Sequence, residues 1–528
     1  MSKLLFEGNE WSVEKLEAVL PEIEKIAKEE LGLDYFPLQI EIISADQMID
    51  AYSTHALPLM YQHWSQGKRH IKDEASYKAG RSGLAYEIIA NTSPSIAYLM
   101  ESNSMTMQTL VLAHCLGHST YFKTNYNYKQ WTSPESIVDY LKFAKAYIQK
   151  CEDQHGVEAV EAVLDAAHAL QYNSIDRYKR KKKTRKQLKA QYDERTKYEE
   201  QSYNDIWRII NVHIADIPSS RSEKDKLKSE AKRRILPEPE ENILYFLEKN
   251  SPVLKTWQRE VLRIVRKIGE YFYPQMQDKV SNEGFACFVH YYIVNRLYEK
   301  GMLSEGSMIE FLSSHSGVIM QTTPDFRTDE QKKRDRQRGK SEPYPYSGIN
   351  VYALGFAMMQ DIKRMCENPT EEDKKWFPDV AGKDWKEVII NDVVPNYRDE
   401  SFIQQFLSPK VIRDFRLFAL RSDENDTQHY GVTATHTDTG YKEVRKTLAE
   451  SYDINRKLTN IQIVDCDMLD TRKLTLHHFA TNNQILAGNP LEMLGFIKQL
   501  WGYEVELVSL DSEGETMECY DTTVKKSY

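Results

Sequence analysis

Residues 110–118 read Leu-Val-Leu-Ala-His-Cys-Leu-Gly-His and place two histidines, His114 and His118, four positions apart. The apolar periodicity around them predicts a helix over roughly Ser104–Phe122, and residues four apart on a helix share one face. The apolar neighbours indicate that both imidazoles are buried, which keeps them uncharged and able to bind a metal ion. We therefore expect a core helix that offers two ligands to one ion.

A second motif reads Ser-Asn-Glu-Gly-Phe-Ala at residues 281–286 and opens a predicted helix that runs toward Tyr298. This motif resembles the segment that carries the third metal ligand, here Glu283, in gluzincin metallopeptidases of the M1 aminopeptidase type. Two histidines and one glutamate would leave an open position for water, as in catalytic zinc sites. The small residues after Glu283 would let another helix approach closely.

The first motif departs from the zincin pattern at Cys115, because zincins carry the general-base glutamate at that position. Losing a general base costs about 10²–10⁴-fold in rate. We expect Glu87 and Glu101, on neighbouring predicted helices, to be candidate acid/base groups or extra ligands, and His168 and His290 to be candidate outer ligands. With this many carboxylates, iron or manganese is as plausible as zinc. The alternatives stay open: a buried hydrogen-bonded histidine, or an ion pair or helix cap at each glutamate.

The composition fits a large folded protein. The chain has 528 residues, 41% of them hydrophobic and 28% charged, with a net charge of −9. Periodicity predicts a mainly α multi-helix body, with a zincin-like core if the metal motifs hold, and a small C-terminal α+β domain. We divide the chain into an N-terminal helical part (1–175), a charged arm or hinge (176–238), a second helical part (239–427) and the α+β domain (428–528).

The charged arm begins with a dense basic run. Nine of the thirteen residues from Arg177 to Lys189 are Lys or Arg. Such a run can bind phosphates or an acidic protein surface, although a solvated helix face has the same composition. The negative net charge disfavours a nucleic-acid ligand, which would have to bind through this segment. The candidate partner-binding residues are Arg177, Lys179, Arg180, Lys181, Lys182 and Lys183.

Several protein classes are excluded or disfavoured. No apolar run approaches the ~20 residues of a bilayer span, and Glu7 interrupts the N-terminus before a signal-peptide core can form. Six scattered cysteines without a Cys-x-x-Cys pair indicate reduced thiols in a cytoplasmic protein. A glycine-rich phosphate loop is absent, so no nucleotide or organic cofactor is indicated.

Many longer blocks together resemble the SpoVR family, named for stage V sporulation protein R. One block reads Pro-Leu-Met-Tyr-Gln-His-Trp-Ser at 58–65, and the likeness runs from about residue 10 to 508. The chain departs from the family at Asn350-Val351-Tyr352, where Asn-Pro-Tyr is common, and in an apparent insertion at 327–342. The other blocks are Gly83–Ile88, Ile96–Glu101, His114–His118, Asp176–Arg180, Trp257–Glu260, Tyr271–Gln275, Asn282–Gly284, Tyr352–Phe356, Arg398–Phe402 and Phe406–Pro409.

The resemblance implies a cytoplasmic bacterial protein involved in spore cortex formation or, in bacteria that do not sporulate, in a stress or starvation response. It also implies a PrkA-type kinase and a von Willebrand A-domain protein as partners. Two functional hypotheses follow. The chain is a metalloprotein with a His/His/Glu site and hydrolase-like chemistry on an amide substrate, or it is a non-catalytic regulatory protein that binds its partners through the basic run and the C-terminal domain.

Overall fold

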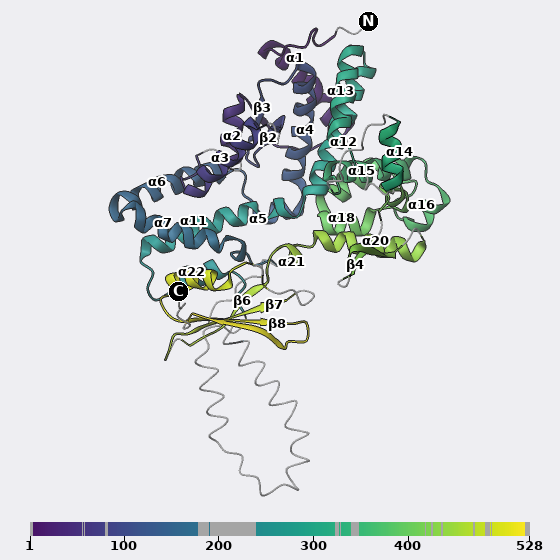
Figure 1. Cartoon of the computed structure of the whole chain (residues 1–528). Helices are drawn as coiled ribbons and strands as arrows, with labels where there is room; N and C mark the ends of the chain where they lie inside the picture. The colour runs from purple at the N-terminus through teal and green to yellow at the C-terminus, as the bar shows by residue number, and fades with distance from the viewer. Residues whose placement is uncertain are drawn as a thin grey trace. The chain divides into compact units, whose positions relative to one another are not determined.

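The computed structural model describes residues 4–177, 190 and 239–522, except for 55, 58, 80–82, 323–326, 328, 339–347, 418, 424–425, 435–436, 468–469, 481–485 and 487. The chain forms two compact units (Figure 1). The first contains residues 1–149 and 271–457, and the second contains residues 150–270 and 458–528. Each unit therefore combines segments that are far apart in the sequence.

The first unit is mainly helical. Its N-terminal segment contains α1 (Val13–Lys25) with a π-helical turn (Ile26–Glu30), β1 (Leu38–Ile43), α2 (Ala45–Ser53), α3 (Trp64–Lys78), β2 (Glu87–Ile89), β3 (Ser95–Met100), α4 (Met105–Thr124), α5 (Tyr126–Trp131) and the start of α6 (Ile137–His155). Its later segment contains a 3₁₀ turn (Pro274–Met276), α12 (Lys279–Glu299), α13 (Glu305–Val318), α14 (Asp329–Gln337), α15 (Val351–Glu367), α16 (Glu371–Trp376), a π-helical stretch (Glu387–Val393), α17 (Val394–Asn396), α18 (Asp399–Phe406), α19 (Pro409–Asp414), the hairpin β4 (Ala419–Asp423) and β5 (Asp426–Ala434), α20 (Asp438–Tyr452) and α21 (Ile454–Lys457).

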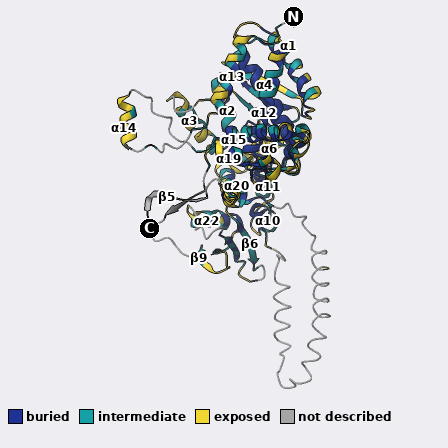
Figure 2. Ribbon diagram, turned by 90° about the vertical axis from the view of Figure 1, so that its right-hand side faces the viewer, coloured by how far each residue is buried: buried dark blue, intermediate teal, exposed yellow. Residues whose placement is uncertain are grey.

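The centre of the first unit is the predicted histidine helix, α4. Ser104 caps it by accepting a hydrogen bond from the Met107 amide at 3.1 Å. Every residue from Met105 to Phe122 is buried, including the polar residues Gln108, His114 and His118. Figure 2 shows burial concentrated around α4 and α12. The predicted helix over Ser104–Phe122 is thus confirmed.

Helix α12 packs between α4 and α15 at unusually short range, because glycines face its backbone. A Cβ at Gly117 would lie 2.7 Å from Ala286 Cα. A Cβ at Gly284 would lie 2.4 Å from Gly355 Cα, and one at Gly355 would lie 2.1 Å from the Val280 carbonyl oxygen. Real Cβ atoms do not tolerate such contacts, so only glycine permits these helix crossings.

The N-terminus of α12 is held by a buried carboxylate from another helix. Asp399 accepts hydrogen bonds from the amides of Lys279, Val280 and Ser281 at 2.8–3.0 Å, and from the Ser281 hydroxyl. A negative charge at this end satisfies amides that have no partner within the helix. Helix α12 begins at Lys279, so Glu283 lies in its second turn rather than in the predicted first turn.

Residues that precede α4 in the chain form a small sheet, although the sequence predicted helices from Leu84 onward. Strand β3 is central: it pairs in parallel with β1 and antiparallel with β2. Its burial on both faces produces a continuous apolar run, which periodicity cannot distinguish from a buried helix. The prediction that Glu87 and Glu101 lie on helices is therefore wrong. Glu87 is the first residue of β2, and Glu101 follows the end of β3.

The second unit contains a four-stranded sheet. Its elements are α7 (Val157–Ala169), a 3₁₀ turn (Gln171–Asn173), α10 (Ile243–Asn250), most of α11 (Thr256–Phe272), β6 (Ile461–Cys466), β7 (Leu474–Phe479), α22 (Pro490–Trp501), β8 (Val505–Leu510) and β9 (Thr516–Asp521). The strand order is β6-β7-β8-β9, and the β7–β8 pair is parallel with α22 as the crossover. The sequence predicts strands over 460–467 and 473–479, a helix over 490–501 and a final strand over 504–509. The structure has these as β6, β7, α22 and β8, and β9 follows as a further strand.

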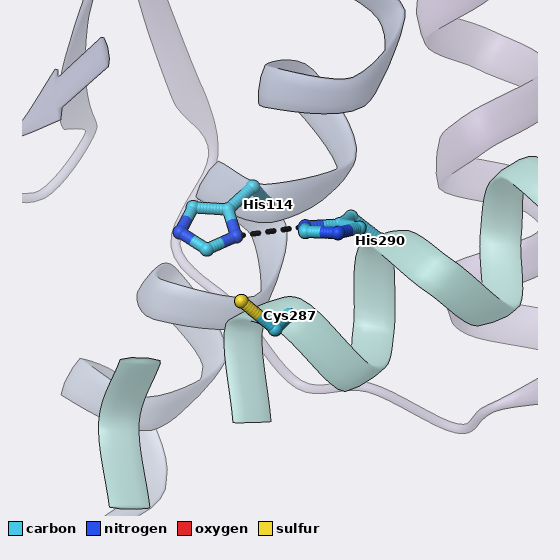
Figure 3. Close-up of side chains that lie close together, drawn as sticks. All are labelled: His114, Cys287 and His290. Carbon is cyan, nitrogen blue, oxygen red and sulfur yellow. Dashed lines mark hydrogen bonds between the residues drawn. The ribbon is translucent and has the colours of Figure 1, made fainter. Parts of the chain in front are cut away.

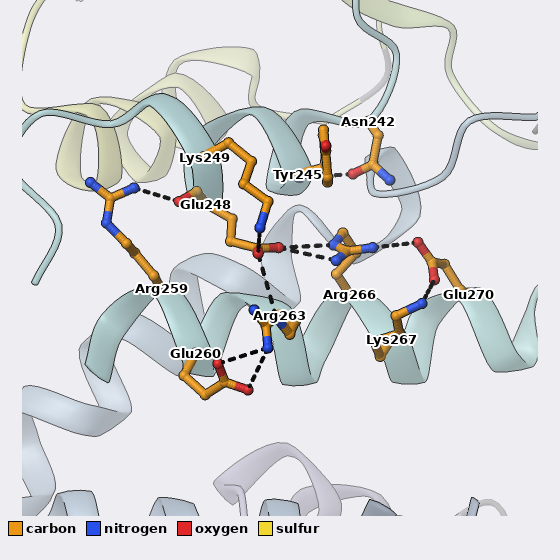
Figure 4. A network of polar contacts seen from close by, with 10 residues as sticks. All are labelled: Asn242, Tyr245, Glu248, Lys249, Arg259, Glu260, Arg263, Arg266, Lys267 and Glu270. Carbon is orange, nitrogen blue, oxygen red and sulfur yellow. Dashed lines mark hydrogen bonds and ion pairs between the residues drawn. The ribbon is translucent and has the colours of Figure 1, made fainter. Parts of the chain in front are cut away.

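Helices α10 and α11 of the second unit are joined by a polar network around Glu248 (Figure 4). Glu248 is 4% exposed and accepts from Arg266 at 3.1 and 3.3 Å and from Lys249 at 2.6 Å. Arg266 also bonds Glu270 at 2.7 Å. Every charge in this network that is buried is therefore paired, as buried ions require.

The predicted fold class, a mainly helical body with a small C-terminal α+β domain, is confirmed. In two loop regions the prediction was less accurate. The sequence predicts a helix over 45–66 that is interrupted near Pro58, and in the structure α2 ends at Ser53 and α3 begins at Trp64. The sequence also predicts an exposed loop over 324–348, inside which α14 lies. None of the helices in the described part of the chain is long and apolar enough to cross a bilayer.

Candidate metal centre

Four side chains from three elements meet between α4, α12 and β2. His118 Nε2 lies 3.0 Å from His114 Nε2 and 3.3 Å from Glu283 Oε2. His114 Nε2 lies 3.7 Å from the same Glu283 oxygen and 3.6 Å from Glu87 Oε1. The structure thus brings together His114, His118 and Glu283, which the sequence predicted as ligands, and adds Glu87.

These separations match those of ligands that share one ion. Atoms at about 2.0–2.1 Å from a tetrahedral zinc ion lie about 3.3 Å apart. The four measured distances run from 3.0 to 3.7 Å around that value. The nitrogen atoms of two imidazoles and the oxygen atoms of two carboxyl groups are also donors that zinc, iron and manganese accept. The residues present therefore fit a divalent transition-metal ion.

Backbone packing explains why ligands so distant in sequence meet. Gly117 precedes His118 on α4 and lies against Ala286 on α12, so the two helices come close at the level of the ligands. Glu283 is one turn before Ala286 on α12. Asp399 anchors the N-terminus of α12 and so fixes where the helix starts. This also fixes the position of Glu283 along the helix axis.

The two glutamates of the site have pKa values that are shifted in opposite directions. Burial alone would raise the pKa of Glu283, but His118 and His114 outweigh it and hold the pKa well below the usual range. Burial likewise opposes charge on His118, yet Glu283 raises the pKa of its imidazole. Burial, aided by His118, lowers the pKa of His114. These shifts keep Glu283 a carboxylate, which is the form that binds a cation.

Glu87 behaves differently from Glu283. Burial raises the pKa of Glu87 to about 8, and the neighbouring Glu283 charge adds to that rise. Its carboxyl therefore carries a proton at neutral pH. A pair of carboxyls with pKa values pushed apart is a common arrangement for acid/base chemistry.

Asn282 orients His118. Its Oδ1 lies 2.9 Å from His118 Nδ1 and can only accept a hydrogen bond, so His118 carries its hydrogen on Nδ1. In a neutral ring this leaves the lone pair on Nε2, the atom that faces Glu283. Partners of this kind fix ligand orientation in metal sites. Sequence reasoning overlooked Asn282, although it directly precedes Glu283 in the motif.

His290 lies behind His114 rather than beside the ligand atoms. Its Nδ1 is 2.9 Å from His114 Nδ1, and its Nε2 is 2.8 Å from Nδ1 of His315 on α13. Figure 3 shows His114 and His290 edge to edge, with the Cys287 thiol beside them. His114, Cys287 and His290 form a second group whose donor atoms lie within 4.8 Å of one another. Neither Cys287 nor His315 was singled out in the sequence, where the spacing of Glu283, Cys287 and His290 along one helix was the available signal.

Family comparisons agree with the likeness of the sequence blocks. The family model described as SpoVR like protein matches residues 10–457, and that described as SpoVR-like C-terminal domain matches residues 459–512. The chain belongs to the SpoVR family. It is 46% identical over 512 residues to the uncharacterized protein YcgB of Escherichia coli (strain K12), covering 97% of this chain and 94% of that protein. No solved structure matches the chain.

The remaining predicted residues of this SpoVR-family chain lie elsewhere. Glu101 is exposed, and its main-chain carbonyl accepts from the Trp11 indole. His168 lies on α7 in the second unit. Arg177 bonds Glu241 at 2.8 Å and the carbonyls of Leu458 and Thr459 within that unit. Lys179, Arg180, Lys181, Lys182 and Lys183 lie outside the described residues.

Cys115, the residue that replaces the zincin general base, is fully buried on α4. Burial raises the pKa of its thiol well above the ordinary value, and the charge of Glu87 adds to that rise. A thiol that resists deprotonation cannot accept a proton at neutral pH.

Proposed function

We propose that this chain is a metalloprotein that binds one divalent transition-metal ion through His114, His118 and Glu283. The observation that carries the proposal is the set of 3.0–3.7 Å separations among the facing atoms of these residues and Glu87. The Nε2 atoms of His114 and His118 lie 3.0 Å apart. If each carries a lone pair that faces the other, the two repel unless a proton or a cation lies between them. A shared ion removes that repulsion and neutralises the Glu283 charge at the same time.

We infer a hydrolase-like activity on an amide substrate, of the peptide or peptidoglycan type. When bound, the ion would polarise a carbonyl group or make a water molecule more acidic. Glu87 would act as the acid/base group, because its carboxyl is protonated at neutral pH and lies 3.6 Å from His114 Nε2. Asn282 holds His118 in the ligand tautomer, and Glu283 stays ionised.

The cellular role that we propose follows from family membership. A SpoVR-family protein is expected in the cytoplasm, in spore cortex formation or in a stress or starvation response, with a PrkA-type kinase and a von Willebrand A-domain protein as partners. The ion would be zinc, iron or manganese.

The test is elemental analysis of purified full-length protein. Wild type should contain close to one equivalent of transition metal, and His114→Ala/His118→Ala should contain almost none. The matched control is His478→Ala, which removes a buried histidine bonded to Ser509 at 2.8 Å in the second unit and should keep the metal. Metal-free wild type that is folded and complements a deletion strain would overturn the proposal.

One observation favours a second function, a non-catalytic regulatory protein. Cys115 occupies the place of the zincin base and its thiol stays protonated, so the usual hydrolytic residue is missing. The basic run from Arg177 to Lys189 would then bind an acidic partner. Complementation separates the two functions: this one predicts that Glu283→Gln works while charge reversal at Lys181, Lys182 and Lys183 fails.

A further inference from the structure

A line of three buried histidines leads away from the proposed metal centre. His114 on α4, His290 on α12 and His315 on α13 are each 3% exposed or less. Nδ1 of His114 lies 2.9 Å from Nδ1 of His290, and Nε2 of His290 lies 2.8 Å from Nδ1 of His315. Every link joins two ring nitrogens, so each link holds exactly one hydrogen that either ring can supply.

Because each neutral ring carries one hydrogen, the two hydrogen bonds that link the three histidines must both be donated in the same direction. A neutral imidazole carries one hydrogen, donates through that nitrogen and accepts through the other. If His315 donates to His290, then His290 donates to His114, and His114 must carry its hydrogen on Nε2. If His114 donates to His290, then His290 donates to His315, and His114 Nε2 has a lone pair. No mixed arrangement satisfies both links.

Only the second direction allows His114 to bind an ion through Nε2. We propose that His290 and His315 are positioning residues, a relay that accepts the Nδ1 hydrogen of His114 and so keeps its Nε2 lone pair aimed at the metal. This inference rests on the proposed function. It adds two residues that never touch the ion and states which nitrogen of each carries the hydrogen when the ion is bound.

The environment of the outer end fixes the His315 ring in place. His315 stacks on Phe311 at 5.7 Å between ring centroids and meets the edges of Phe356 at 4.8 Å. Its Nε2 is buried and has no hydrogen-bond partner among the residues that the structure describes. The ring is therefore held by packing, and its Nδ1 is the atom that makes a polar contact. The relay direction puts a hydrogen on the buried Nε2, which has no acceptor among the described residues, and binding of the ion must offset that cost.

Cys287 offers a competing arrangement. Its thiol, His114 Nδ1 and His290 could hold a soft ion on the opposite side of the His114 ring. That ion would bind His114 Nδ1, the nitrogen that donates to His290 in the relay. The two arrangements therefore exclude each other. The 2.9 Å between His114 Nδ1 and His290 Nδ1 does not separate the two arrangements, because the facing Nε2 atoms of His114 and His118 lie at a similar 3.0 Å. The relay is favoured because it leaves His114 Nε2 able to bind the ion together with His118 and Glu283.

Zinc affinity of the full-length protein, measured by competition with a chelator, tests the relay. His290→Leu should weaken zinc binding about 10–100-fold, the usual effect of losing a partner of a metal-bound histidine. His290→Gln should recover most of the affinity, because its amide oxygen can accept from His114 Nδ1. His478→Leu removes a buried hydrogen-bonded histidine of the second unit and should leave the affinity unchanged.

A spectroscopic measurement on wild type covers the case in which His290→Leu fails to fold. Nitrogen-15 NMR of the zinc-loaded protein, labelled in its histidine rings, should show the hydrogens of His290 and His315 on Nε2. A hydrogen on Nδ1 of His290 would overturn the relay. So would unchanged zinc affinity in folded His290→Leu while wild type binds zinc.

Two other outcomes separate the relay from the metal proposal. Wild type that binds no zinc overturns the proposed function and the relay with it. Loss of the ion in Cys287→Ser, with an intense sulfur-to-metal absorption band in the cobalt-loaded wild type, leaves metal binding itself standing, overturns the relay and reassigns the ion from His114, His118 and Glu283 to His114 Nδ1, Cys287 and His290.

Discussion

Gly117 of α4 lies directly against Ala286 of α12: a Cβ built on Gly117 would come to 2.7 Å from Ala286 Cα and 3.2 Å from its Cβ. Gly117 is the residue before His118, and Ala286 is one turn beyond Glu283. The crossing point of the two helices is therefore also the point where the proposed ligands meet.

Gly117→Ala should push α12 away from α4. We expect a loss of about 1–3 kcal/mol in unfolding free energy, typical of an overpacked core, together with weaker zinc binding because Glu283 moves from the histidines. Gly67→Ala is the control: Gly67 lies on α3 with nothing within 4 Å of an added Cβ, and alanine favours a helix. Chemical denaturation and zinc titration check both. Wild-type zinc affinity in Gly117→Ala would contradict the role of this contact.

Asn282→Leu should weaken metal binding without unfolding the protein. The variant removes the acceptor that holds the His118 Nδ1 hydrogen at 2.9 Å, so we expect a loss of about 10–100-fold in zinc affinity. Asn282→Asp keeps an acceptor oxygen and should retain binding. Asn242→Leu, which removes the side-chain cap of α10 in the second unit, should lower stability but not affinity. Equal affinities in Asn282→Leu and Asn282→Asp would count against this orientation of His118.

Asp373 should make stability depend on acid pH. Burial would raise the pKa of its carboxyl, but hydrogen bonds from Arg364 at 2.7 and 2.9 Å and from Thr370 outweigh burial and lower it to about 2. The unfolded chain has an Asp pKa of about 3.9, so the stabilisation is complete above that value and is lost as the pH falls toward 2.

Asp373→Asn should therefore cost on the order of 1–2 kcal/mol at pH 7, and the cost should shrink below about pH 4. Denaturant midpoints of wild type and variant across this range give the measurement. Asp438→Asn, whose ion pair with Lys375 is exposed, should have little effect at any pH. A gap between Asp373→Asn and wild type that stays constant down to pH 3 would refute the assignment.

Glu248→Ala should be strongly destabilising. It leaves Arg266, 8% exposed, without one of its two carboxylate partners, and breaking a buried ion pair costs about 3 kcal/mol or more. Glu260→Ala breaks a pair with the largely exposed Arg263 and should cost less than about 1 kcal/mol. Thermal unfolding should show a larger loss of stability in Glu248→Ala than in Glu260→Ala. Equal losses would contradict the claim that burial makes the Glu248 ion pairs in Figure 4 the more important ones.

Local sequence signals predicted the helices that carry the ligands. Apolar periodicity was enough to predict α4 and the helix that runs from the Asn-Glu-Gly-Phe-Ala motif toward Tyr298. The sheet before α4 was missed because β3 is buried on both faces and therefore has no alternating pattern. That error placed Glu87 on a helix next to the predicted histidine helix, whereas the structure brings it to His114 from β2.

The tertiary partners of the ligands could not be read from the sequence. Asn282 and His315 acquire their roles only when α4, α12 and α13 pack together. The close glycine contacts join residues on α4, α12 and α15. Glu87 and Glu101 looked equivalent in the sequence. Only the pairing of β2 with β3 brings the first to His114, while the second ends in an exposed turn.

The order of synthesis matters for a unit built in this way. Helix α4, which is buried on every side in the folded unit, leaves the ribosome before the whole of residues 125–278, and only then does α12 appear to cover it. Until α12 has been synthesised, the nascent chain exposes the surface of α4 that is buried in the folded unit, together with His114 and His118. We therefore expect the emerging protein to need a chaperone over this interval, and its ion to be loaded only after translation has passed Glu299.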